Sequence, residues 1–363
     1  MIKLALFSLV IILTYSAASC REDSSEAPTG LPSPSSPVAN ATPPLIPSPI
    51  ISPTAIPTQL PTEPLEPTTE PSKTPMAEVL EESVQRYQEP GDYLDSIMVS
   101  NLNRWFVVHL PPQYEPGEPM PMVLNLHGRG STAIQQQNAS RMNQKADEEG
   151  FIVVYPQALG QPTTWFGVLF GEVGQPDMAF FAELISYLER QISVDPARIY
   201  ATGISNGATM VNRLGCEMSL VFAAVAPVAG AHSGLQLCEI VQPVSMLALH
   251  GTEDQIIPFE GAAPDVPSVQ TWVEAWAERN GCLGSPRSEQ PYEDVILQSW
   301  DDCDDGTAVG LYAVEGGGHT WLGLKYGPSR DVIPEVGATD VIWEFFKAHP
   351  KRSIIRDLPG EKA

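Results

Sequence analysis

The sequence predicts a mainly parallel β-sheet with helices packed on both faces, preceded by a long segment that cannot form a core. Two observations predict this fold. From about Tyr87 onward, short apolar runs alternate with stretches of helical periodicity, which is the pattern of a parallel sheet wound by helices. Most of the runs are apolar throughout, as in strands that are buried on both faces.

We expect strands at seven apolar runs of the chain. They are Arg104–Leu110, Met122–Leu126, Phe151–Tyr155, Arg198–Thr202, Phe222–Val228, Met246–His250 and Val309–Val314. Between the third and fourth runs, apolar residues recur at helical spacing behind Asp177, which we expect to cap a helix. These residues are Phe181, Leu184, Ile185, Leu188 and Ile192. The helix is expected to cover one face of the sheet.

The start of the chain has the features of an export signal. Lys3 precedes an apolar run from Leu4 to Leu13, and small residues follow up to Cys20. The run has the length of a signal-peptide core and is short for a membrane span. The residues before Cys20 resemble a bacterial lipoprotein box. We therefore expect a lipid anchor on Cys20 that holds the protein at the outer face of a bacterial membrane; the alternative is a simple signal peptide with a chance cysteine.

Residues 21–84 are expected to form a disordered tether. Fifteen of the 36 prolines lie between Ala27 and Pro75, a stretch without Phe, Trp or Tyr. Such a composition has too little apolar surface to bury a core. The sequence therefore divides into a signal peptide (1–20), a linker (21–84), a folded domain (85–350) and a C-terminal tail (351–363).

The charge balance disfavours several classes of partner. Twenty Lys and Arg residues against 44 Asp and Glu residues give a formal net charge of −24. We expect such an acidic chain to bind neither nucleic acid nor an anionic lipid surface, so that the lipid anchor is its only link to a membrane. No metal-ligand set, phosphate loop or dinucleotide fingerprint is found. We therefore expect no metal and no cofactor.

The stretch GISNG, residues 203–207, matches the G-x-S-x-G pattern of a nucleophilic serine. The apolar run RIYAT leads into it, and a helical pattern follows it. In a strand–turn–helix elbow of this kind, a strained turn exposes the serine hydroxyl, and the two glycines let strand and helix approach closely. We therefore predict that Ser205 is a nucleophile.

A serine of ordinary acidity needs an oriented histidine as its base. We expect this base to be His319, because it follows an expected strand through a loop of three glycines without obstructing side chains. The other histidines are more simply interpreted as structural. They are His109, His127, His232, His250 and His349.

The acid that orients the histidine is expected at Asp254, just beyond the end of the expected strand Met246–His250. Glu253 and the loop Asp301–Asp305 are the alternatives. The order Ser205, Asp254, His319 along the chain is the order found in α/β-hydrolases.

An oxyanion that develops on the substrate needs two backbone N–H donors. Asn206, directly after the nucleophile, is expected to supply the first. Arg129, in the stretch LHGRGS, is expected to supply the second, with Gly130 as the alternative. An ordinary glycine turn is the other interpretation of this stretch.

Six stretches of the chain carry a family resemblance. They are LHGRGS, VVYPQA, DPARIYATGISNG, FAAVAPVAG, LHGTEDQIIPFEG and GGGHTW. Over about Asp92 to Ala348, the chain resembles the secreted esterase branch of the α/β-hydrolases, which includes polyhydroxybutyrate depolymerases, feruloyl esterases and acetyl xylan esterases. The resemblance implies hydrolysis of carboxylic esters, of plant cell-wall or polyester origin, through an acyl-enzyme. We expect a monomer.

The four cysteines after Cys20 allow three disulfide pairings. The resemblance favours Cys216–Cys238 and Cys282–Cys303. Trp165 and Trp321 are expected to form an aromatic rim for a feruloyl group or a sugar, with plain packing as the alternative.

Two other functions are compatible with the sequence. The first is a surface-displayed binding module that has kept the fold and lost catalysis; the intact set Ser205, Asp254 and His319 disfavours it. The second is an acyltransferase, which would use the same residues with an acceptor other than water.

Overall fold

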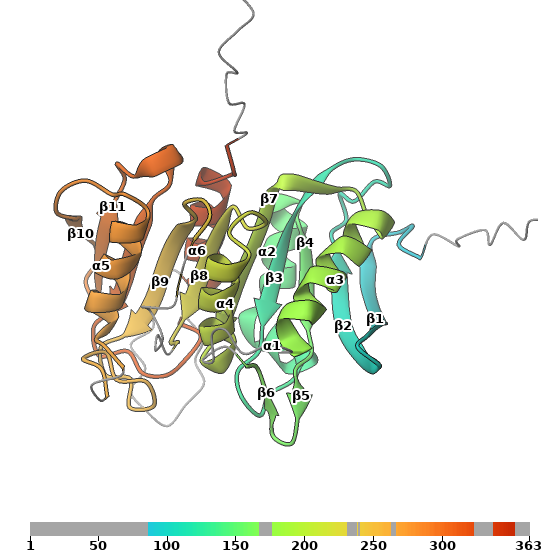
Figure 1. Cartoon of the computed structure of the whole chain (residues 1–363), viewed down its shortest axis with the longest axis horizontal. Coiled ribbons are helices and arrows are strands. Elements are labelled where there is room, and N and C mark those ends of the chain that lie inside the picture. The colour runs from blue at the N-terminus through green and yellow to red at the C-terminus, as the bar shows by residue number, and fades with distance from the viewer. Residues whose placement is uncertain are drawn as a thin grey trace, which may run out of the picture. The chain divides into compact units, whose positions relative to one another are not determined.

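The computed structural model describes residues 86–166, 176–230, 238, 240–262, 266–322 and 337–352. The expected signal peptide, lipidated Cys20 and linker lie outside the described residues, as do His232 and the end of the tail. The part that is described is built around a ten-stranded sheet (Figure 1).

The strands of this sheet follow the order β1-β2-β4-β3-β7-β8-β9-β12-β11-β10. Their bounds are β1 Gly91–Val99, β2 Leu102–Leu110, β3 Met120–Leu126, β4 Ile152–Pro156, β7 Val194–Ile204, β8 Ala224–Val228, β9 Ser245–Gly251, β10 Arg287–Tyr292, β11 Val295–Trp300 and β12 Val309–Val314. The strands from β4 to β12 in this order pair in parallel, and the outer strands on each side pair antiparallel. Each of the seven expected strands is present.

The strands of this sheet that the sequence did not predict are β1, which begins the strand order, and β11 and β10, which end it. β10 is almost entirely exposed, and β1 is exposed at every second residue. An edge strand with one face in water does not need a continuous apolar run. For this reason β1 and β10 leave a weak signal in the sequence. β11 lies between β10 and β12, and it has four half-buried residues between two buried ends, so it also lacks a continuous apolar run.

Helices cover both faces of the sheet (Figure 1). One face carries α3 (Pro176–Gln191), α4 (Asn206–Glu217) and α5 (Val269–Arg279), and the other carries α1 (Ala133–Ser140), α2 (Met142–Glu149) and α6 (Ala338–Ala348). In β3, Met122 and Leu124 face the first group of helices, and Val123 between them faces the second. This alternation along a buried strand gives the sheet two apolar cores.

Asp177 does not cap α3 as expected. The helix begins at Pro176, so Asp177 lies in its first turn. There its carboxylate pairs with Arg104 at 2.7 Å, and both side chains are 1% exposed. The acidic residue that the sequence placed at the helix start is thus half of a buried ion pair.

The two disulfides predicted from the resemblance are confirmed. Cys216 in the last turn of α4 is bonded to Cys238, and Cys282 after α5 is bonded to Cys303 before β12. Disulfides of this kind are typical of extracellular proteins. In the described part of the chain, no helix is both long and apolar enough to cross a membrane.

Candidate functional site

Ser205 forms the turn between the end of β7 at Ile204 and the start of α4 at Asn206. Its backbone has φ 57° and ψ −122°, a region that residues with a side chain rarely adopt. The turn is held on both sides, because the Ser205 N–H donates to the Val228 carbonyl at 2.9 Å and the Ser205 carbonyl accepts from the Thr209 N–H at 3.0 Å. The strained elbow expected from GISNG is therefore present.

The glycines of this elbow are required by close packing. A Cβ atom on Gly203 would lie 2.7 Å from the carbonyl oxygen of Leu126, and one on Gly207 would lie 2.5 Å from that of His127. The elbow therefore packs directly against the end of β3. As a result, Ser205 lies beside the loop that follows β3, where a Cβ on Gly128 would be 3.4 Å from that of Ser205.

Asp254 and His319 are brought together by the loops that follow β9 and β12. These strands are adjacent and parallel, so both loops lie together at the carboxyl ends of the strands. His319 Nδ1 lies 2.8 Å from Asp254 Oδ2. The described residues include no hydrogen bond between Ser205 and His319, a contact that is often long in a free enzyme and tightens when substrate binds.

The Asp254 carboxylate is buried and held by several donors. Oδ1 accepts the N–H groups of Ile256 and Ile257, both at 2.8 Å, and His250 Nε2 lies 3.4 Å from Oδ2. Burial alone would raise the pKa of Asp254, but hydrogen bonds from His250, His319 and the Ile257 backbone outweigh it and hold the pKa well below its usual range. Asp254 is therefore ionised.

The ionised carboxylate determines which nitrogen of His319 carries the proton. A carboxylate only accepts hydrogen bonds, so Nδ1 of His319 must be the donor to Asp254. In a neutral imidazole this leaves the lone pair of Nε2 free to accept a proton. The side chain of His319 is 18% exposed, so solvent and small molecules can reach it.

The alternative acids have other surroundings. Glu253 is exposed at the surface. Asp301 pairs with Arg287 at 3.1 Å, and its side chain is 58% exposed. Of Asp254, Glu253 and Asp301, it is thus Asp254 that is bonded to His319.

The other described histidines are bonded in ways that suit structural roles. His127 is fully buried; Nδ1 donates to the Gly128 carbonyl at 2.7 Å, and Nε2 accepts the Ala158 N–H at 3.1 Å. Burial lowers the pKa of His127. Further ring-nitrogen contacts join His109 to Asp92 and Asp147, His250 to the Ile257 carbonyl and to Asp254, and His349 to the Phe345 carbonyl.

The two expected oxyanion donors lie in segments that adjoin Ser205. Asn206 is the first residue of α4, so its N–H has no acceptor within the helix. Gly130 donates its N–H to the Thr163 carbonyl at 2.8 Å. Because this donor is occupied, the geometry favours Arg129 over Gly130 as the second donor.

The aromatic rim expected from Trp165 and Trp321 is not formed in the described structure. Trp165 is 2% exposed and Trp321 is 4% exposed. The indole N–H of Trp165 donates to the His127 carbonyl at 2.9 Å, and that of Trp321 donates to Thr339 Oγ1 at 3.0 Å. A buried indole with a bonded N–H packs the interior, which corrects the expectation of an exposed rim.

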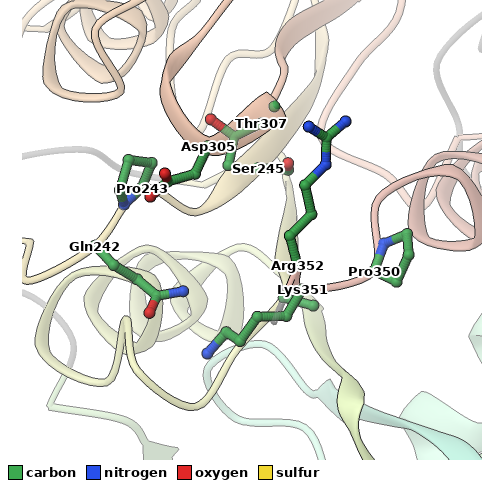
Figure 2. A pocket seen from close by; sticks show the side chains of 10 residues that line it. Gln242, Pro243, Ser245, Asp305, Thr307, Pro350, Lys351 and Arg352 are labelled. Carbon is green, nitrogen blue, oxygen red and sulfur yellow. The ribbon is translucent and has the colours of Figure 1, made fainter. Parts of the chain in front are cut away.

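A cavity of about 470 Å³ lies at the opposite end of the parallel strands, where β8 and β9 begin (Figure 2). Its lining comprises Ala223, Gln242, Pro243, Ser245, Asp305, Gly306, Thr307, Pro350, Lys351 and Arg352. None of the candidate catalytic residues is among them. The residues that the structure describes also contain no group of three or more His, Cys, Asp and Glu side chains that could hold a metal ion.

Comparison with known proteins places this chain in a family. The family described as esterase PHB depolymerase matches residues 105–272, a range that includes Arg129, Ser205 and Asp254. The protein NocK of Nocardia uniformis subsp. tsuyamanensis, named as a candidate esterase, is 30% identical over 271 residues, which cover 67% of this chain and 77% of NocK. The chain belongs to the esterase PHB depolymerase family.

Relatives in this family are named as carboxylic ester hydrolases. Feruloyl esterase B of Piromyces equi is 29% identical over 240 residues, which cover 60% of this chain and 42% of that protein. The chain thus spans less than half the length of this relative. A solved acetyl xylan esterase from Aspergillus awamori is 17% identical with a TM-score of 0.52, over 70% of this chain and 99% of that one. The shared fold confirms the predicted α/β-hydrolase architecture.

Sequence reasoning missed two features of the site. His250, which the sequence suggested to be structural, lies within 3.4 Å of the Asp254 carboxylate; its position four residues before Asp254 in LHGTED was the available signal. The segment Thr163–Phe166, considered only for its tryptophan, contacts both sides of the nucleophile. No motif marks this segment, because its contacts are made largely by backbone groups.

Proposed function

We propose that this chain is an exported serine esterase that hydrolyses carboxylic esters through an acyl-enzyme. Ser205 is the nucleophile, His319 the base and Asp254 the residue that orients the base. The observation that carries the proposal is the 2.8 Å contact between His319 Nδ1 and Asp254 Oδ2, made at the same edge of the sheet as the strained Ser205 turn. The family membership supports the reaction class.

The reaction begins with proton transfer between the serine and the histidine. Ser205 Oγ attacks the ester carbonyl carbon while its proton moves to Nε2 of His319. The imidazolium formed is stabilised by the ionised Asp254. The tetrahedral intermediate then collapses: the bond from carbon to the leaving oxygen breaks, and His319 returns the proton to that oxygen. The alcohol leaves, and the acyl group remains on Ser205.

Water completes the cycle by the same steps, with water as the nucleophile and Ser205 Oγ as the leaving group. His319 removes a proton from a water molecule, whose oxygen attacks the acyl carbon, and Ser205 Oγ leaves with the proton returned by His319. In both halves, negative charge develops on the former carbonyl oxygen. The backbone N–H groups of Asn206 and Arg129 are proposed to bind this oxyanion.

The substrates are proposed to be small or oligomeric esters, such as feruloyl or acetyl esters of plant cell-wall sugars. The named activities of the relatives support this class. Because Trp165 and Trp321 are buried, the proposal does not assign them to substrate contact. A screen of the purified protein against acetylated xylan, feruloyl esters, short-chain acyl esters and hydroxybutyrate esters would identify the acyl group.

Export and anchoring are proposed from the sequence and supported by the two disulfides. In the proposed organisation, Cys20 carries the lipid, residues 21–84 form the tether, residues 85–350 form the enzyme and residues 351–363 form a tail. Cys20→Ala should move activity from the membrane fraction to the medium or to the unprocessed precursor. A wild-type protein that is wholly soluble, without a lipidated Cys20, would refute the anchor and leave the esterase proposal intact.

The proposal is tested by turnover of a soluble ester by the wild type and by Ser205→Ala. Loss of hydrolysis in a variant that keeps the wild-type melting temperature supports the triad. Full turnover by Ser205→Ala contradicts it, and the absence of turnover by the wild type would favour a binding module. Product analysis with and without an added alcohol or sugar distinguishes hydrolysis from acyl transfer.

A further inference from the structure

The segment Thr163–Phe166, here called the bracket segment, comprises the short strand β6 (Thr163–Thr164) and the two residues after it. β6 forms a hairpin with β5 (Leu159–Gly160), and this hairpin lies at the edge of the sheet where the parallel strands end (Figure 1). The bracket segment holds no proposed catalytic residue. It is nevertheless bonded to both segments that carry the proposed oxyanion donors.

On one side, the bracket segment binds the side chain of Asn206. Asn206 Oδ1 accepts the Trp165 N–H at 2.7 Å and the Thr164 hydroxyl at 3.2 Å, and Asn206 Nδ2 donates to the Trp165 carbonyl at 3.0 Å. The amide thus binds the N–H and the carbonyl of one residue at the same time. A two-point contact fixes the orientation of Asn206, and with it the first turn of α4.

On the other side, the bracket segment binds the loop that follows β3. Gly130 donates its N–H to the Thr163 carbonyl at 2.8 Å, and Thr163 Oγ1 donates to the Ser131 carbonyl at 2.7 Å. The Trp165 indole donates to the His127 carbonyl at 2.9 Å. These bonds lie before and after Arg129 in the chain, so they fix the peptide that presents the Arg129 N–H.

The far end of the bracket segment is tied to the protein core. The Phe166 N–H donates to Asp177 Oδ2 at 3.0 Å, and the Phe166 carbonyl accepts from Arg213 at 2.6 Å. Asp177 is in turn paired with Arg104, and both side chains are almost completely buried. Arg104 donates two further hydrogen bonds to backbone carbonyls, at 3.2 and 3.4 Å, and a network of buried hydrogen bonds holds its members in one geometry. The bracket segment is therefore a rigid link and not a free loop.

We infer that the bracket segment sets the relative position of the Asn206 and Arg129 N–H groups, and that the Asn206 side chain is a positioning residue for the oxyanion hole. This inference rests on the proposed esterase mechanism. Pre-aligned donors stabilise charge that exists only in the transition state. Their misalignment therefore lowers kcat and leaves KM nearly unchanged, because ground-state binding does not use them.

The test compares two asparagines of the same helix. Asn206→Ala removes the two-point contact and keeps the backbone N–H. Asn212→Ala is the matched control, because Asn212 lies in the same helix, is buried, and accepts a hydrogen bond from a tryptophan, the indole N–H of Trp272 at 3.1 Å. Removal of one oxyanion donor costs about 10²–10³-fold in kcat, so misalignment by Asn206→Ala is expected to cost roughly 10- to 100-fold. KM should change by less than about 3-fold.

Asn212→Ala is expected to lower the melting temperature and to keep kcat within about 2-fold of the wild type. Affinity for a boronic acid that mimics the tetrahedral intermediate gives a second readout, which should fall in Asn206→Ala by the same factor as kcat. An unchanged kcat in Asn206→Ala, or an equal fall of kcat in Asn212→Ala, would overturn the inference.

Thr163→Val keeps the test decisive if Asn206→Ala does not fold. This variant removes the hydroxyl bond to Ser131 and retains the shape of the side chain and the backbone bond to Gly130. It should lower kcat by roughly 5- to 10-fold at constant KM, and an unchanged kcat would count against the bracket. Ser205→Ala is measured in the same series: an active Ser205→Ala refutes the proposed mechanism itself, whereas an inactive one beside a fully active Asn206→Ala refutes only the bracket.

Discussion

The loops after β3 and after β12 each hold a histidine next to glycine, yet they place it in opposite situations. In the first loop, both ring nitrogens of His127 are bonded to backbone groups, and the ring is fully buried. In the second, Nδ1 of His319 is bonded to a carboxylate, and the side chain is partly exposed. Proximity to the site therefore does not make a histidine a base. The partners of its two nitrogens do.

Of these two histidines, His319 is the proposed base, and its replacement should have the largest effect on kcat. His319→Ala removes the proposed base, and loss of the base in a serine triad costs on the order of 10⁶-fold in kcat. The melting temperature should change little because the ring is partly exposed. Steady-state kinetics on a soluble ester checks the prediction, and a variant with more than a tenth of the wild-type rate would contradict the assignment.

Asp254→Asn should have the next largest effect. The amide cannot hold His319 with the proton on Nδ1 as the carboxylate does, so kcat is expected to fall by up to ~10⁴-fold. Glu253→Gln is the matched control, because Glu253 is the exposed neighbouring acid. Rate measurements on both variants decide the assignment: if Glu253→Gln is the impaired variant, the acid has been misassigned.

The sequence was sufficient to predict much of the fold and the chemistry. Buried strands are recognisable in the sequence as apolar runs. The strained turn at Ser205 was located by its motif, and the disulfide pairs by the family resemblance. The burial of Trp165 was not predictable, since an indole suits a rim as well as a core. For Asn206, the sequence predicted the backbone N–H as a donor but not the contacts of the side chain. The partners of the side chain lie about 40 residues earlier, in a segment without a motif.

Loss of a disulfide should have a smaller effect, on stability and not on chemistry. The two bridges close loops with sequence separations of 22 and 21 residues. Each is expected to contribute roughly 3 kcal/mol to the free energy of unfolding. Denaturant titration of the pair variant Cys282→Ser with Cys303→Ser measures this contribution. An unchanged unfolding free energy would mean that the bridge adds nothing to the fold.

The smallest expected effect is a loss of stability as the pH falls. Burial lowers the pKa of His127, and that of His349, in the folded protein, so below about pH 6.5 the unfolded chain binds more protons than the folded one. The resulting contribution to the free energy of unfolding is present above about pH 6.5 and is lost as the pH falls below that value. Denaturant midpoints between pH 7.5 and pH 5.5 should therefore decrease. His319→Ala should show the same decrease, and a flat profile in both proteins would contradict the role given to His127.

The proposed mechanism requires that Ser205 is the nucleophile activated by the pair of His319 and Asp254. Its most direct test is labelling with a fluorophosphonate followed by peptide mass spectrometry. We predict one covalent adduct, on Ser205, formed rapidly by the wild type and at least about 10³-fold more slowly by His319→Ala. An adduct on another serine, or equal labelling rates in the two proteins, would contradict the claim.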